Sequence, residues 1–551
     1  MIPGRRETWI KGLLINFGLA LLGSLLFAAA FPNPFVEKGL PLLAWVAYVP
    51  VFVLIRRASL GASFFWGALY GYAAYGLFNY WLAAFHPLAG LIVGLVYLVY
   101  LGLLFFLLKL ALIFFPRRAY LVQWVFWLAY EYLKTKGFLG YSYGITGYSQ
   151  WAQIPLIQIA GLFGVWGVSA LTVFSSAWLA QALWPDSQAP AGGIAGFARA
   201  LRAFFLKDKI PPLLWAGALG AALIYGFFPP PDFSTYPSAR LALVQHNTDP
   251  WKGAGAPDPI KEYRADFQVL RRLSGEALRE DPKPDLVVWS ETAFIPRIYW
   301  HANYRGDPPS WNLVKELLDY LSLQEVPFLI GNDDARKDPA KNPDPREDYR
   351  IDYNGALLFE QGNLTALYRK LHLVPFTEYF PYKKQLPRIH KALKEADTHF
   401  WEKGEEAVVF SLPGFKFSTP ICFEDAFGYL SREFVRRGAE LIVNISNDAW
   451  SKSLSAQNQH LAMSVFRAVE NRRSVARSTA SGQTCGIDPA GRILAMAPPF
   501  SESWITVELP VMTHITPYTR YGDYLAWIFT AAAFTLLIAG LVSRIIKTKK
   551  K

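Results

Sequence analysis

Cysteine is almost absent from this chain of 551 residues, which contains only Cys422 and Cys485. Two cysteines allow at most one disulfide bond, so no disulfide framework supports the fold. Charged residues are also scarce, at 18%, whereas hydrophobic residues make up 52% and aromatic residues 16%. This composition is too apolar for a protein that is soluble throughout, so part of the chain is expected to lie in lipid. The length also predicts at least two domains.

Sequence patterns for metal and phosphate binding are missing as well. The eight histidines show no paired spacing with carboxylates or cysteines, and no Gly-rich phosphate loop occurs, so we expect no metal and no cofactor. The formal charge of +12 could suit nucleic acid. However, the basic residues form small groups beside apolar runs, where membrane orientation explains them, and we expect no nucleic-acid partner.

Apolar runs dominate the first part of the chain and return at its end. A bilayer core is about 30 Å thick, and a helix of about 20 apolar residues crosses it. The run from Leu13 to Phe31 is too long for a signal-peptide core and is expected to remain as an anchor. The runs near 40–55 and 119–134 are short, and Glu131 lies within the second of these two. The eight candidate spans lie near 12–31, 40–55, 60–84, 88–115, 119–134, 159–184, 211–228 and 523–543.

Basic residues alternate along these runs in a way that predicts the topology. Short loops rich in Lys and Arg stay in the cytoplasm. With eight spans, every basic group falls on the cytoplasmic side, both termini are cytoplasmic, and the segment from about 229 to 522 faces outward. The groups are Arg5, Arg6 and Lys11; Arg56 and Arg57; Arg117 and Arg118; Arg199, Arg202, Lys207 and Lys209; and Lys547, Lys549, Lys550 and Lys551.

The segment 229–522 has the sequence character of a soluble domain between a transmembrane part, 1–228, and a last span with a basic tail, 523–551. Short apolar runs alternate with stretches of helical period, which predicts an α/β sandwich. The expected strands are Leu241–Gln245, Asp285–Trp289, Phe328–Gly331, Ala356–Phe359, Phe415–Cys422 and Leu441–Ile445. The expected helices are Ile260–Arg279, Trp311–Ser322, Ala426–Arg437 and Gln457–Arg472, and the charged stretch Arg336–Arg350 is expected to be an exposed loop.

Cys422 ends an apolar strand and precedes a helix that we expect to begin near Asp425. Backbone N–H groups and the helix dipole stabilise an anion at such a point, which favours the thiolate, the attacking form of cysteine. A buried structural cysteine is equally consistent with this motif. Cys485 has no comparable setting and is interpreted as structural.

Glu291 follows another predicted strand, where the active sites of open α/β sheets gather. It could accept the proton of Cys422, although a solvated residue at a strand end is the alternative. Lys370 is the candidate cation that would stabilise an oxyanion, with Glu378 nearby in the same aromatic and proline-rich segment. His372 would allow a Cys–His dyad, but a structural role for it is favoured.

Taken together in chain order, Glu291, Lys370 and Cys422 resemble the Glu-Lys-Cys triad of the nitrilase superfamily. The chain resembles one branch in particular, the apolipoprotein N-acyltransferases, in which a nitrilase-like domain is inserted between the last two of eight membrane helices. The phrases that carry this resemblance span nearly the whole chain: Val-Gln-His-Asn (244–247), Trp-Ser-Glu-Thr-Ala (289–293), Lys-Leu-His-Leu-Val-Pro-Phe-Thr-Glu-Tyr (370–379), Ile-Cys-Phe-Glu-Asp (421–425), Asn-Ile-Ser-Asn-Asp-Ala-Trp (444–450), Arg-Ala-Val-Glu-Asn-Arg-Arg (467–473), Gly-Tyr-Ser-Gln (147–150) and Pro-Leu-Ile-Gln (155–158).

The resemblance implies a role for each candidate. Glu291 would be the general base, Lys370 the transition-state stabiliser and Cys422 the nucleophile. Glu378 and Glu424 would assist around the site, and Trp251 and Trp450 would be substrate-side residues. The chain departs from the family in having Phe423 where a tyrosine usually follows the nucleophile, and Ser451 where an aromatic residue follows Asp-Ala-Trp. Phe423 cannot make a phenolic hydrogen bond, so any orientation of Glu424 must come from elsewhere.

The reaction implied is the transfer of a fatty acyl chain, through a thioester on Cys422, from a membrane phospholipid to the α-amino group of the diacylglyceryl-cysteine of an apolipoprotein. The resemblance also implies a bacterial inner-membrane enzyme with its catalytic domain in the periplasm, and we expect a monomer. The main alternative is a membrane-tethered amidohydrolase of the same superfamily, whose intermediate water would resolve. A non-enzymatic scaffold is disfavoured because all three triad positions hold chemically competent residues.

Overall fold

The computed structural model divides into two compact units. A helical unit comprises Met1–Pro229, Ser453–Ala462 and Tyr521–Lys551, and a sandwich unit comprises Pro230–Lys452 and Met463–Arg520. Helix α18 (Leu454–Asn471) therefore contributes its first half to the helical unit and its second half to the sandwich unit. The structure describes residues 3–85, 87–184, 193–228, 232–248, 258–338, 350–375, 377–383, 385–388, 390–391 and 400–549.

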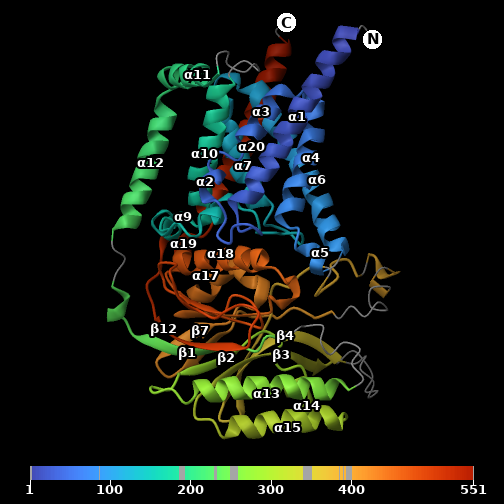
Figure 1. Cartoon of the computed structure of the whole chain (residues 1–551), viewed down its shortest axis with the longest axis vertical. Helices are drawn as coiled ribbons and strands as arrows, with labels where there is room; N and C mark the ends of the chain where they lie inside the picture. Colours follow the sequence, from blue (N-terminus) through green and yellow to red (C-terminus); the bar gives the residue numbers. More distant parts are fainter. Residues whose placement is uncertain are drawn as a thin grey trace. The chain divides into compact units, whose positions relative to one another are not determined.

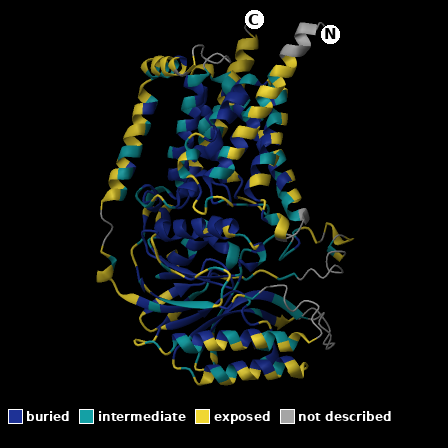
Figure 2. Cartoon of the chain, viewed as in Figure 1, coloured by how far each residue is buried: buried dark blue, intermediate teal, exposed yellow. Residues whose placement is uncertain are grey.

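The helical unit forms where the apolar runs lie. Large apolar side chains remain exposed on its helices, among them Leu14, Leu214 and Phe534 at 63%, 70% and 58%, and Figure 2 shows exposed residues along α1, α12 and α20. The helices are α1 (Pro3–Ala30), α2 (Pro41–Ala44), α3 (Val49–Arg57), α4 (Leu60–Phe78), α5 (Leu82–Phe85), α6 (Pro87–Phe114), α7 (Ala119–Leu133), α8 (Ile154–Ile157), α9 (Ala160–Phe163), α10 (Val165–Leu183), α11 (Gly193–Lys207), α12 (Ile210–Phe227) and α20 (Tyr524–Lys549).

Four helices among the described residues are long and apolar enough to cross a membrane: α1, α6, α12 and α20. The pair Ile154–Phe163 and Val165–Leu183 adds a fifth if it is one span, bent by 119°. Gly164 makes the bend, because its φ of +65° is a conformation that other residues rarely adopt. The runs near 40–55 and 119–134 form the shorter helices α2, α3 and α7, the last two with 9 and 15 residues. The predicted number of eight spans therefore remains a prediction.

The sandwich unit contains two six-stranded sheets, in the orders β12-β1-β2-β3-β4-β5 and β11-β10-β9-β8-β7-β6. Parallel pairing joins β1, β2 and β3 in one sheet and β7, β8 and β9 in the other, with antiparallel strands outside them. The strands are β1 (Ser238–Gln245), β2 (Leu286–Trp289), β3 (Phe328–Lys337), β4 (Arg350–Glu360), β5 (Asn363–Arg369), β6 (Val409–Leu412), β7 (Phe415–Ser418), β8 (Leu441–Ser446), β9 (Ser474–Thr479), β10 (Cys485–Ile487), β11 (Ile493–Met496) and β12 (Ser503–Pro510).

Helices cover the outer faces of the two sheets, which confirms the predicted α/β sandwich. In Figure 1, α13 (Pro259–Ala277) and α15 (Pro308–Ser322) lie together on the side of the sheet that contains β1–β4. Their apolar side chains form one buried cluster with those of β1–β4. The remaining helices are α14 (Ile298–Asn303), α17 (Gly428–Arg436) and α19 (Pro517–Tyr521).

The inner faces of the sheets contact one another through β9. The Ser478 hydroxyl lies 3.1 Å from the backbone oxygens of Val244 and of Val288, which belong to β1 and β2. All residues of β2, β8 and β9 are buried, as expected for central parallel strands with both faces covered. The strand ends of both sheets therefore lie close enough to share a site.

Candidate active site

Glu291 lies two residues beyond β2, where the chain turns closely against β3. Gly331 of β3 permits this approach, because a Cβ atom there would lie 2.2 Å from the backbone oxygen of Ser290 and 2.7 Å from the Cα atom of Glu291. The N–H of Ala293 donates to the backbone oxygen of Gly331 at 3.0 Å. These contacts fix the backbone on both sides of the carboxylate.

The Glu291 carboxylate has a partner on each oxygen. The side-chain amide of Asn354 donates to Oε1 at 2.8 Å, and the backbone N–H of Asn447 donates to Oε2 at 3.0 Å. Asn354 lies in β4 and Asn447 directly follows β8, so each sheet supplies one donor. This buried carboxylate is thereby held in one orientation, with both oxygens solvated by the protein.

Lys370 follows β5 directly and is completely buried. Its N–H donates to the backbone oxygen of Asn354 at 2.9 Å, which continues the pairing of β4 with β5. The ammonium lies 2.7 Å from Oε1 of Glu378 and 3.4 Å from Oε1 of Glu291. The second oxygen of Glu378 accepts from the backbone N–H of Val374 at 2.8 Å. One cation thus serves two carboxylates.

The charges of this cluster determine how its members titrate. Burial alone would lower the pKa of Lys370, but the charges of Glu378 and Glu291 outweigh burial and raise it well above its ordinary value. Burial raises the pKa of Glu378, and the Glu291 charge adds to the increase while the Lys370 ammonium opposes it. With both carboxylates ionised, the three groups carry one net negative charge. Lys370 therefore stays positively charged within a cluster whose net charge is negative.

Cys422 begins the short 3-10 helix Cys422–Ala426, four residues beyond the end of β7. Its φ is +51°, an uncommon conformation for a residue with a side chain and one that surrounding contacts must maintain. Asn444 of β8 supplies such contacts, because its amide donates to the backbone oxygens of Pro420 at 3.0 Å and of Cys422 at 3.3 Å. The expected helix starts at Gly428 as α17, later than the predicted Asp425.

The expectation that its setting makes Cys422 a thiolate is wrong for the resting site. Burial raises the pKa of the Cys422 thiol well above 9.0, and the Glu291 charge raises it further, whereas Lys370 lowers it. Glu291 and Lys370 are thus close enough for their charges to act on the sulfur. Because a 3-10 helix of five residues offers little dipole and a negative charge lies nearby, the thiol keeps its proton until a base removes it.

Glu424 joins the segment after Lys370 to the segment that carries Cys422. Its carboxylate accepts from the Tyr368 hydroxyl at 2.8 and 2.9 Å, and from the backbone N–H groups of Leu371, His372 and Ile421 at 2.7 to 2.9 Å. Burial raises the pKa of Glu424 to about 7, against these donors. Phe423 has no hydroxyl that could orient the Glu424 carboxylate. The Tyr368 hydroxyl and three backbone N–H groups orient it instead.

The other candidates lie around this centre with different partners. Ring nitrogen Nδ1 of His372 is 2.9 Å from the Tyr429 hydroxyl, and the ring packs 3.9 Å from that of Phe427, so a structural role fits it better than a dyad. Burial lowers the pKa of His372 to about 4. Phe423 packs edge-on against Phe427, at 4.9 Å between ring centroids.

Two tryptophans and the second cysteine complete the predicted set. Trp450 lies in the short helix Ala449–Ser451 after β8, three residues beyond the backbone donor to Glu291. Cys485 is buried in β10 and, like Cys422, forms no disulfide bond. Trp251 lies outside the described residues. No group of three or more potential metal ligands occurs among the residues described.

Sequence analysis assigned no role to three residues that support the site. Asn354 orients Glu291, but it lies outside the predicted strand Ala356–Phe359 and among other polar residues, so nothing in the sequence marked it. Arg477 is completely buried in β9 and ion-pairs with Asp425, and also with Asp448 at 3.1 Å. Arg477 thus ties the Cys422 segment to the segment that orients Glu291. The third residue is Asn444, which holds the Cys422 backbone.

Two sheets flanked by helices, with a cysteine, a lysine and a glutamate at their shared strand ends, define a carbon–nitrogen hydrolase fold. The family model described as Carbon-nitrogen hydrolase matches residues 240–515. A second model, described as Apolipoprotein N-acyltransferase N-terminal domain, matches residues 23–178 of the helical unit.

Curated relatives match the chain across both units. Apolipoprotein N-acyltransferase 1 of Treponema denticola is 45% identical over 544 residues, which cover 97% of each chain. Apolipoprotein N-acyltransferase 1 of Treponema pallidum is 47% identical over 556 residues, which cover 99% of each chain. The chain belongs to the apolipoprotein N-acyltransferase family and is an enzyme of the acyltransferase class. Its apolar helices and this membership make it a bacterial membrane protein.

Among solved structures, Nit3 of Saccharomyces cerevisiae, a member of the nitrilase superfamily, is 20% identical, with a TM-score of 0.35. That match covers 53% of this chain and 94% of the other.

Proposed function

We propose that this chain transfers a fatty acyl chain from a membrane phospholipid to the α-amino group of the diacylglyceryl-cysteine of apolipoproteins. The observation that carries the proposal is the buried Lys370 ammonium between Glu291 and Glu378, whose charges act on the Cys422 thiol. Family membership favours transfer over the amidohydrolase alternative. Glu291, Lys370 and Cys422 are the proposed catalytic residues.

The first half of the proposed reaction forms a thioester. The Cys422 sulfur attacks the carbonyl carbon of the phospholipid ester as Glu291 accepts the thiol proton. Negative charge develops on the carbonyl oxygen, where Lys370 and backbone donors near Phe423 stabilise it. The carbon–oxygen bond then breaks, and Glu291 returns the proton to the departing lysophospholipid oxygen. The acyl chain remains on sulfur.

The second half transfers the acyl chain to nitrogen. The unprotonated α-amine attacks the thioester carbon, and Glu291 accepts a proton from that nitrogen. The carbon–sulfur bond breaks, an amide forms, and the proton passes from Glu291 to the Cys422 sulfur. Glu378 and Glu424 support these steps by holding Lys370 and the two segments beside it. Phe423, Trp450 and Trp251 are proposed as substrate-binding or supporting residues.

The proposed topology has eight membrane crossings, with both termini in the cytoplasm. The catalytic domain, 229–522, would then lie in the periplasm of the inner membrane, between the spans of 1–228 and the span of 523–551. The alternation of basic groups supports this orientation. Both substrates carry acyl chains, which cost about 0.8 kcal/mol per methylene group to expose to water. A membrane location for a monomeric enzyme therefore suits both the acyl donor and the acceptor.

Purified full-length protein incubated with labelled phospholipid tests the proposal. Mass spectrometry should find a fatty acyl adduct on Cys422 that persists until an amine acceptor is added. Rapid loss of the adduct to water would instead favour an amidohydrolase. Cys422→Ser and Glu291→Gln should each abolish lipoprotein N-acylation while the unfolding temperature stays near that of wild type, and normal N-acylation by either variant would refute the assignment.

A further inference from the structure

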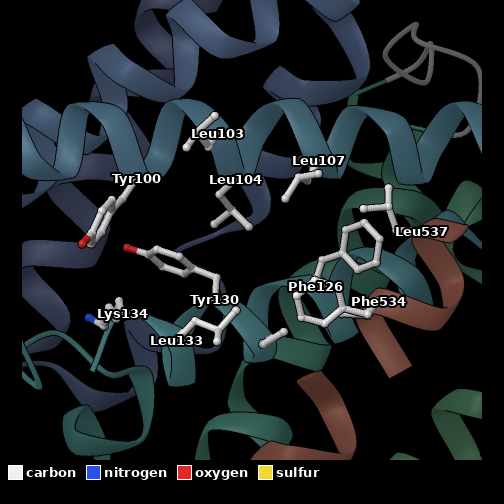
Figure 3. A pocket seen from close by; sticks show the side chains of 12 residues that line it. Tyr100, Leu103, Leu104, Leu107, Phe126, Tyr130, Leu133, Lys134, Phe534 and Leu537 are labelled. Atoms are coloured by element: carbon white, nitrogen blue, oxygen red, sulfur yellow. The ribbon is translucent and has the colours of Figure 1, made fainter. Parts of the chain in front are cut away.

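A cavity of about 250 Å³ lies within the helical unit, between α6, α7 and α20. Most of its wall is apolar, and Figure 3 shows Phe126, Phe534 and Leu537 gathered at one end. The exposed side chains at its edge, Leu103, Leu133 and Phe534, are also apolar. A cavity with such a rim opens toward an apolar medium, which on these helices is lipid.

The opposite end of the cavity is polar. Figure 3 shows the Tyr100 and Tyr130 hydroxyls and the Lys134 ammonium there. Lys134 is only 3% exposed, and its ammonium donates to the Tyr75 hydroxyl at 2.7 Å and to the backbone oxygen of Tyr143 at 2.8 Å. An ammonium has three N–H donors, so one remains for another acceptor.

In the described part of the chain, no carboxylate lies within ion-pair distance of the Lys134 ammonium, and the charge of Glu131 acts on it only from farther away. The nearest acid in sequence, Glu131, directs its Oε1 to the backbone N–H and the hydroxyl of Thr146. Burying an ammonium is costly unless an anion or several acceptors compensate it. A ligand that brings an anionic group to this end and an alkyl chain to the other would satisfy both parts of the cavity.

We propose that this cavity binds an anionic amphiphile with one acyl chain, its acidic head group held by Lys134 with the Tyr100 and Tyr130 hydroxyls. The volume of about 250 Å³ lies just below the 300–1,000 Å³ of ordinary small-molecule pockets, so the cavity encloses part of one acyl chain and the rest lies along its apolar rim. The head group is a carboxylate or a phosphate, as in a free fatty acid or a lysophospholipid. The site uses no residue of the Cys422 centre.

Equilibrium binding to full-length protein in detergent tests the proposal, with labelled palmitate, palmitoyl-lysophosphatidylglycerol and uncharged monopalmitoylglycerol as probes. All measurements use a Cys422→Ala background, so they do not depend on acyl transfer. At least one acid should bind saturably and at least tenfold more tightly than the uncharged probe. The acid that binds identifies the head group. Absence of saturable binding by both acids, or equal affinity for the uncharged probe, would overturn the proposal.

Two variants, each with a matched control, test the two ends of the cavity. The Lys134→Met protein should bind the acid and the uncharged probe with equal affinity. A general loss of stability would not change the ratio of these two affinities. The control variant Lys136→Met should keep the preference for the acid. Ala533→Phe should fill the cavity and remove saturable binding, whereas Ala531→Phe, on the exposed side of α20, should not. A retained acid preference in Lys134→Met, or retained binding in a folded Ala533→Phe protein, would contradict the proposed site.

Discussion

Replacing Lys370 with methionine is the sharpest perturbation of the proposed centre. The ammonium is completely buried and lies 2.7 and 3.4 Å from two carboxylates, so Lys370→Met leaves Glu291 and Glu378 close together without their cation. Removing one partner of a buried ion pair costs about 3–5 kcal/mol. We therefore expect a loss of this size in the free energy of unfolding of the sandwich unit, measured by chemical denaturation of the full-length protein.

A second substitution separates this loss of stability from the loss of catalysis. Adding Glu378→Gln to Lys370→Met removes one of the two like charges and should recover about 1–3 kcal/mol of stability. It restores no positive charge beside the reacting carbonyl. Formation of the acyl adduct on Cys422 should therefore remain at least about 100-fold slower than in wild type, the cost of one lost oxyanion donor.

Two results would refute this reasoning. A Lys370→Met protein as stable as wild type would mean that the two carboxylates do not depend on the ammonium. A double variant that formed the adduct at the wild-type rate would mean that Lys370 does not act on the carbonyl oxygen. Glu378→Gln alone is the matched control, because it keeps the ammonium beside Glu291 and should lose far less activity than the double variant.

The remaining predictions concern the nucleophile and its supports. Because the pKa of Cys422 lies well above 9.0, alkylation of its thiolate should accelerate about tenfold per pH unit from pH 7 to 9, and a plateau within that range would contradict the assignment. Gly331→Ala should displace the chain at Glu291 and lower the free energy of unfolding by about 1–3 kcal/mol. The rate of adduct formation should fall by a larger factor than this loss of stability explains, and full activity would contradict the prediction. Arg477→Met leaves Asp425 and Asp448 without their buried cation and should lower the free energy of unfolding by about 3–5 kcal/mol, so a change below about 1 kcal/mol would exclude this role.

Sequence patterns predicted β2 and β8, but not β9, the other central strand of its sheet, whose sequence Ser-Val-Ala-Arg-Ser-Thr is mostly polar. Leu286–Trp289 is an unbroken apolar run, and Leu441–Ile445 is interrupted only by Asn444, because both faces of these strands are covered, and such runs are visible without a structure. Glu291 followed from its place just beyond the first of these strands and Cys422 from the end of another predicted strand, whereas Lys370 was chosen as the cation of an aromatic and proline-rich segment. The helix after Cys422 begins at Gly428 rather than near Asp425, because the chain first makes the 3-10 helix Cys422–Ala426. The Asp425 carboxylate pairs with Arg477 and Ser464.

Pairing between distant segments explains what sequence patterns could not predict. Asn354 reaches Glu291 only because β4 pairs with β3, which in turn pairs with β2. Whether the Cys422 thiol is protonated at rest depends on the charges of Glu291, Glu378 and Lys370 around it. These charges come from separate segments of the chain. In the helical unit, the run 159–184 gave no sign of the 119° bend, because the positive φ of Gly164 lies within an otherwise continuous apolar stretch.

The sharing of one ammonium by two carboxylates has a consequence for the order of events in the proposed cycle. In the free enzyme, ionising the sulfur would add a second net negative charge to the cluster. Once the sulfur carries an acyl group, it no longer titrates and the electrostatic conflict disappears. The acyl-enzyme of the proposed cycle therefore adds no negative charge to the cluster, and it can persist until a lipoprotein arrives.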